Sequence, residues 1–115
     1  MKRNYHHIKV AFRMMGLTEE QLQDLKSQVS SVRKVKIGQY HKNPKLFVAS
    51  FRIQKGKQYN DLCIFLKKTK ISEDSYGLWI SILTTKTISG VRVPKHVLKL
   101  YEKTGGLIDF NFDSG

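Results

Sequence analysis

Residues 76–112 constrain the fold more than any other stretch, because they read as strand, turn, helix, turn and strand in succession. The first part, 76–86, is apolar on both alternating faces, with Leu78 and Ile80 on one side and Trp79 on the other. This pattern predicts a central strand that is buried over most of both faces. We expect the remaining elements to pack around it.

The second part of this stretch predicts a helix and a closing strand. A Ser-Gly turn precedes Pro94, which suits the first position of a helix over 95–103. Two glycines then favour a left-handed backbone conformation at the C-terminal end of this helix. Residues 107–112 alternate apolar with polar side chains, as a strand does. None of these elements carries a catalytic group.

The rest of the chain contains elements of the same two kinds. Alternation, turn residues and a capping box at Thr18-Glu-Glu-Gln21 predict strands at 6–15, 33–40 and 46–54 and helices at 18–30 and 58–70. The strand over 33–40 is expected to turn Val35 and Ile37 inward. The segment 58–70 stays open, because its apolar residues 63–66 equally fit a short buried strand.

The order of the elements is strand, helix, strand, strand, helix, strand, helix, strand. Hairpin-linked strands and segregated helices predict an α+β protein with a single, mostly antiparallel sheet on which two or three helices pack. A strand–helix–strand pattern occurs near both ends of the chain, which suggests a ferredoxin-like arrangement. A chain of 115 residues without linkers is expected to form a single domain, residues 1–115.

Charge is the main clue to function. The chain has 21 lysines and arginines against 9 aspartates and glutamates, for a net charge of +12. No acidic residue lies between Asp24 and Asp61, so much of the positive charge is concentrated there. This asymmetry favours a large acidic partner, either nucleic acid or an acidic protein surface. The alternative is a solubilising surface without a specific partner.

The basic segment predicts one binding surface. If the strands over 33–40 and 46–54 form a hairpin, their outward charges and those of the flanking turns collect on one side. The residues expected to bind the partner are Arg33, Lys34, Lys36, Tyr40, His41, Lys42, Lys45, Arg52, Lys55 and Lys57. The aromatic residues Phe47 and Phe51 fall on the inner face of their strand, so the surface is predicted to lack a stacking platform for bases.

Little in the sequence indicates catalysis, and we expect a protein without enzymatic activity, metal or cofactor. The four histidines are not spaced to share a metal ion, and the one cysteine, Cys63, excludes an internal disulfide and has apolar sequence neighbours. One enzymatic alternative is a small basic ribonuclease that uses His41 with Tyr40 and the nearby lysines. No signal peptide or membrane-length apolar run is visible, so we expect a cytoplasmic protein that does not bind membranes.

Two parts of the sequence resemble a known family. Residues 90–101 (GVRVPKHVLKLY), followed by 105–112 (GGLIDFNF), look like the closing helix and strand of a family of small bacterial domains of unknown function. Residues 10–20 (VAFRMMGLTEE) resemble the opening strand, glycine and helix of that family. Its members occur among the immunity proteins of bacterial toxin systems, including contact-dependent inhibition.

The resemblance implies a non-catalytic immunity protein that binds and neutralises a cognate toxin domain. Because the expected binding surface is basic, the toxin would have to present an acidic surface. This is the leading interpretation of the sequence. A nucleic-acid-binding module that uses the same lysines is the first alternative, and the ribonuclease is the second.

Overall fold

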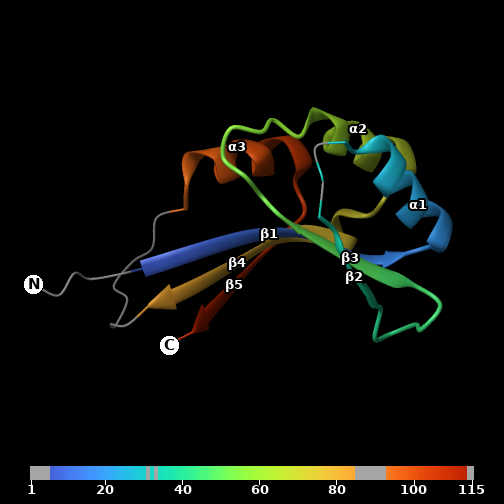
Figure 1. The fold of residues 1–115 in the computed structure, drawn as a ribbon, viewed down its shortest axis with the longest axis horizontal. Coiled ribbons are helices and arrows are strands. Elements are labelled where there is room, and N and C mark those ends of the chain that lie inside the picture. Colours follow the sequence, from blue (N-terminus) through green and yellow to red (C-terminus); the bar gives the residue numbers. More distant parts are fainter. Residues whose placement is uncertain (1–5, 31, 33, 85–92, 114–115) are drawn as a thin grey trace, which may run out of the picture.

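The computed structural model describes residues 6–30, 32, 34–84 and 93–113. Within them, one five-stranded sheet carries three α-helices on one face and leaves the other face without a helix (Figure 1). The elements in chain order are β1 (His6–Leu17), α1 (Glu19–Gln28), β2 (Lys36–Gln39), β3 (Phe47–Arg52), α2 (Asn60–Thr69), the 3-10 helix η1 (Glu73–Ser75), β4 (Tyr76–Thr84), α3 (Lys95–Thr104) and β5 (Leu107–Asp113). Strands and α-helices follow one another in the predicted order, with η1 inserted before β4.

The strands form a mixed sheet in the order β2-β3-β1-β4-β5. The central strand is β1, not β4 as predicted, and it runs antiparallel to both β3 and β4. β2 runs antiparallel to β3, whereas β5 runs parallel to β4, because α3 returns the chain in the same direction. The prediction of an α+β protein with a single sheet is confirmed. Three of the four strand pairs are antiparallel, as expected of a mostly antiparallel sheet. The parallel pair β4–β5 makes the sheet mixed, and with the strand order β2-β3-β1-β4-β5 it departs in detail from a ferredoxin-like arrangement.

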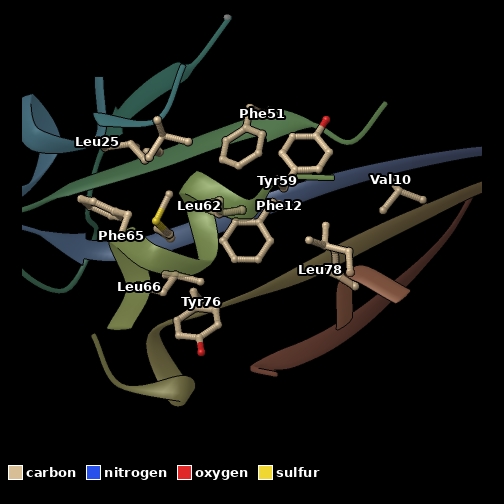
Figure 2. Close-up of a cluster of buried hydrophobic side chains, with 14 of the residues drawn as sticks. Val10, Phe12, Leu25, Phe51, Tyr59, Leu62, Phe65, Leu66, Tyr76 and Leu78 are labelled. Carbon is tan, nitrogen blue, oxygen red and sulfur yellow. The ribbon is translucent and has the colours of Figure 1, made fainter. Parts of the chain in front are cut away.

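The hydrophobic core lies between the sheet and the helices. Phe12 of β1 is fully buried and stacks on Phe51 of β3 and Tyr76 of β4, at ring-centroid distances of 5.6 and 5.7 Å. Tyr59, just before α2, continues this row at 6.3 Å from Phe51 (Figure 2). Stacked aromatic rings bury large apolar areas, so this row links three strands to the helical layer.

Local sequence signals explain how the helices form. α1 begins with the predicted capping box: the N–H of Gln21 donates to Oγ1 of Thr18 at 3.1 Å, and the N–H of Thr18 donates to Oε1 of Gln21 at 3.0 Å. This exchange satisfies two N–H groups at the start of the helix. The segment 58–70 contains a helix, α2, whose Leu62 and Leu66 lie one turn apart and are both buried.

Two sequence-based expectations need correction. The strand expected over 33–40 is limited to β2, and Ile37, expected inside, is 42% exposed because β2 is an edge strand. The prediction that β4 is buried over most of both faces is also wrong. Leu78 and Ile80 are buried on the helix-covered face, but Trp79 points to the open face and is only half-buried.

The open face is polar because of the alternation along β1. Phe12 and Met14 are fully buried under the helices, whereas Lys9 and Arg13 occupy the intervening positions that face the open side. The two faces of the central strand therefore differ in chemistry as well as in coverage.

Candidate functional site

A groove of about 620 Å³ crosses the open face between the β2–β3 hairpin and β4. At its centre, Ala11 of β1 pairs with Arg52 of β3 on one side and with Trp79 of β4 on the other. These three residues form one row across the sheet, and their side chains point to the same face. The small side chain of Ala11 leaves space between the two larger ones.

The groove is strongly basic. Its described lining contains no carboxylate and five cationic side chains, those of Lys9, Lys34, Lys36, Arg52 and Lys57. All of these except Lys57 are exposed. Cationic side chains that gather in a groove without acidic neighbours create a local positive potential, which attracts anionic partners.

Trp79 gives the groove an aromatic wall. The guanidinium carbon of Arg13 lies 4.7 Å from the centre of the indole ring, which is a cation–π contact between neighbouring strands. Because Trp79 is half-buried, part of its surface stays accessible from the groove. The groove thus combines positive charge with an aromatic surface, whereas the sequence predicted a basic surface without a stacking platform.

The structure divides the predicted binding surface into two groups at opposite ends of the β2–β3 hairpin. The first group lines the groove and consists of Lys34, Lys36, Arg52 and Lys57. The second lies in the turn between β2 and β3 and consists of Tyr40, His41, Lys42 and Lys45. Lys55 is exposed in the loop after β3, outside the groove lining, and Arg33 lies outside the described residues. The structure therefore brings four of the predicted residues together in the groove and four others together in the hairpin turn.

Sequence reasoning missed three residues of the site, Lys9, Arg13 and Trp79. The alternation of β1 assigns Lys9 and Arg13 to an outward face, and this signal could have identified them. For Trp79 the signal is Ser81, which shares its face of β4, whereas the other face carries only large apolar or aromatic residues such as Ile80.

The turn that carries His41 is held by its own hydrogen bonds. Nε2 of Gln39 donates to the carbonyl oxygen of Pro44 at 2.8 Å, and Oδ1 of Asn43 accepts from the N–H of Lys45 at 3.0 Å. The His41 ring packs edge-on against Tyr40, with ring centroids 5.3 Å apart. These contacts orient the turn, but they supply no hydrogen-bonded partner for proton transfer by His41.

A second pocket, of about 330 Å³, lies beside Cys63 between α2, η1 and α3. Burial raises the pKa of the Cys63 thiol above its ordinary value, and the positive charges of Lys103 and Lys67 offset part of this effect. A thiol with a raised pKa is mostly protonated at neutral pH and is a weak nucleophile. The thiol in this pocket is therefore not activated for nucleophilic chemistry.

The described residues include no group of three or more histidine, cysteine or acidic side chains that could hold a metal ion. No helix in the described part of the chain has the length and apolar character needed to cross a membrane. No protein-family model matches the chain, and no curated protein or solved structure is significantly similar to it. The groove itself is therefore the basis for inferring function.

Proposed function

We propose that this protein binds single-stranded nucleic acid in the groove on the open face of its sheet, without catalysis. The observation that carries this proposal is the position of Trp79, which lines the same groove as Lys36 and Arg52. Proteins that bind single strands combine a positively charged groove with aromatic side chains on which bases stack. Both features meet here on one face of one sheet.

The positions of the side chains suggest their roles. Lys36 and Arg52, near the β2–β3 edge, and Lys9, on β1, neutralise phosphates of the bound strand. Trp79 offers its accessible ring surface to one base, and the Arg13 guanidinium fixes the orientation of the ring. Contacts to phosphates and stacking on a base depend little on which base is present, so we expect binding with weak sequence preference.

A single strand fits this arrangement better than a duplex. In a duplex each base is stacked between its neighbours, so its face is not available to Trp79. The described lining of the groove contains no histidine or carboxylate, the groups that most often transfer protons in nuclease reactions. For this reason the proposal is binding and not cleavage.

Fluorescence anisotropy with labelled oligothymidine and oligouridine, each compared with a duplex of equal length, tests this proposal. We expect the single strands to bind more tightly than the duplex. Trp79→Ala should weaken single-strand binding by about 1–3 kcal/mol, whereas Trp79→Phe should keep part of the affinity. Absence of binding, or equal binding of single strand and duplex that Trp79→Ala leaves unchanged, would contradict the proposal.

A second candidate is the immunity-type function that the sequence resemblance implies, with an acidic toxin domain in the same groove. The contact between Arg13 and Trp79 favours it, because tryptophan and arginine often dominate the binding energy of protein interfaces. A pull-down from native lysate, performed with and without nuclease treatment, separates the two candidates. One acidic protein retained in a stoichiometric complex, and lost with Arg52→Glu, would support the immunity function, whereas loss of all bound material after nuclease would support nucleic-acid binding.

A further inference from the structure

β5 is an edge strand of the sheet, and it lacks most of the features that usually prevent an edge strand from pairing with another chain. It is seven residues long (LIDFNFD), and its register with β4 is regular throughout. Edge strands in natural proteins are usually short or carry lysine, proline or a bulge, which prevents pairing with other chains. The opposite edge follows this rule, because β2 has four residues and begins with Lys36. β5 is longer, has no lysine, proline or bulge, and carries aspartates as its charged residues.

The same strand exposes apolar side chains. Ile108, Phe110 and Phe112 are in register with buried residues of β4, yet they are 38%, 50% and 60% exposed. The rings of Phe110 and Phe112 stack at 6.5 Å. Three such side chains in succession form a continuous apolar strip along the edge, of the kind that marks an interaction surface.

The sequence of β5 is complementary to a second copy of itself. An antiparallel pair centred on Phe110 places Ile108 opposite Phe112 and Asp109 opposite Asn111. The apolar side chains then meet on one face, and Asp109 faces an amide instead of another acid. Centring the pair on Asp109 would bring two aspartates together, and centring it on Asn111 would place Asp109 opposite Asp113, again two acidic residues.

We propose that two copies of this chain form a symmetric dimer through β5, paired antiparallel about Phe110. The two-fold axis is then perpendicular to the sheet, so both open faces lie on the same side of one continuous sheet. Five strand spacings of about 4.8 Å separate the two copies of β1, which places the two grooves on the order of 25 Å apart. A nucleic-acid strand that reaches both grooves gains avidity; this consequence rests on the proposed function, whereas the dimer does not.

Dimerisation and nucleic-acid binding are expected to depend on salt concentration in opposite ways. Each copy has a net charge of +12, so two copies repel each other most strongly at low ionic strength. The dimer should therefore strengthen as salt increases. Binding of nucleic acid to the groove should weaken over the same range, so the failure of one proposal does not imply the failure of the other.

Sedimentation equilibrium of the full chain, over a range of protein and salt concentrations, tests the dimer. Asn111→Asp places a carboxylate opposite Asp109 at two symmetric positions, and we expect the dimer to weaken about ten-fold. Adding Asp109→Lys to that variant should restore the dimer, because opposite charges then face each other. Ile37→Lys alters an exposed apolar side chain at the other edge, and this control should leave the dimer unchanged.

Three outcomes would overturn this proposal. The first is a wild-type protein that stays monomeric at all concentrations and salt levels. The second is a dimer that persists with Asn111→Asp and with Phe110→Lys, which places two lysines at the two-fold axis. The third is a combined Asp109→Lys and Asn111→Asp variant that dimerises no better than Asn111→Asp alone. Asn111 is exposed, so circular dichroism should show that its variants are folded.

Discussion

The guanidinium carbon of Arg13 lies 4.7 Å from the ring centre of Trp79, and this contact joins β1 to β4 on the open face of the sheet. Because Trp79 is only half-buried, its removal should cost less than the about 3–5 kcal/mol typical of a buried tryptophan. We expect Trp79→Ala to lower the free energy of unfolding by about 1–2 kcal/mol. Urea unfolding measures this change, and a loss above about 3 kcal/mol would show that the ring belongs to the core.

Two positions on α2 test the orientation of that helix. Leu62 is fully buried, whereas Ile64, two residues later, is 65% exposed. Leu62→Ala should lower the free energy of unfolding by about 2–5 kcal/mol, because it leaves a cavity under the helix. Ile64→Ala is the matched control and should change it by no more than about 0.5 kcal/mol. Similar losses for the two variants in urea unfolding would contradict the helical placement.

Gly77 allows β5 to lie close to β4. A Cβ atom at this position would come within 2.7 Å of the carbonyl carbon of Leu107, whereas one at Gly38 would meet nothing within 4 Å. Gly77→Ala should therefore force the two strands apart and destabilise the protein by about 1–3 kcal/mol. Gly38→Ala should stay close to wild type. Thermal unfolding of both variants gives the comparison, and an unaffected Gly77→Ala would argue against the β4–β5 pairing.

Tyr76 makes stability depend on pH in the alkaline range. Its hydroxyl donates to the carbonyl oxygen of Thr104 at 2.5 Å, and burial, together with the charge of Glu73, raises its pKa above the ordinary 10.0. The folded state thus holds the phenol proton more tightly than the unfolded state does. The resulting stabilisation is complete below about pH 10 and is lost as pH rises through the folded-state pKa.

Tyr76→Phe removes both the hydrogen bond and this titration. At neutral pH we expect it to lower the free energy of unfolding by about 1 kcal/mol, since the Thr104 carbonyl loses its donor. Between about pH 8 and pH 11, wild-type stability should fall more steeply than that of the variant. Parallel pH profiles in urea unfolding would contradict this account.

The sequence predicts most local structure, because the signals involved are local. The capping box at Thr18 forms as predicted. Gly105 and Gly106 at the end of α3 have the expected positive φ, 65° and 90°, but ψ of Gly105 is −147°, so this residue is not in the left-handed helical conformation. The buried row of β1 also follows from alternation, with Phe12 and Met14 inside. Each of these features depends on residues that are close together in the chain.

The candidate site could not be predicted as fully, because it depends on which strands are neighbours. Ala11 connects Arg52 to Trp79 only because β1 lies between β3 and β4, and no local signal encodes that order. Likewise, Lys36 and Lys42 are close in sequence but lie at opposite ends of the hairpin. Charge along the chain therefore identified the basic segment but not the groove.

The central claim is that the groove, and not the hairpin turn, binds nucleic acid. The most direct test compares two double charge reversals, Lys36→Glu with Arg52→Glu and Lys42→Glu with Lys45→Glu, which change the net charge equally. Anisotropy with a labelled single strand is measured for each over a series of salt concentrations. We expect the groove variant to lose most affinity and to reduce the slope of log K against log salt by about 1.4, as for two lost phosphate contacts, while the turn variant keeps a near wild-type slope. Equal losses in the two variants would contradict the claim, because they would show that net charge alone attracts the strand.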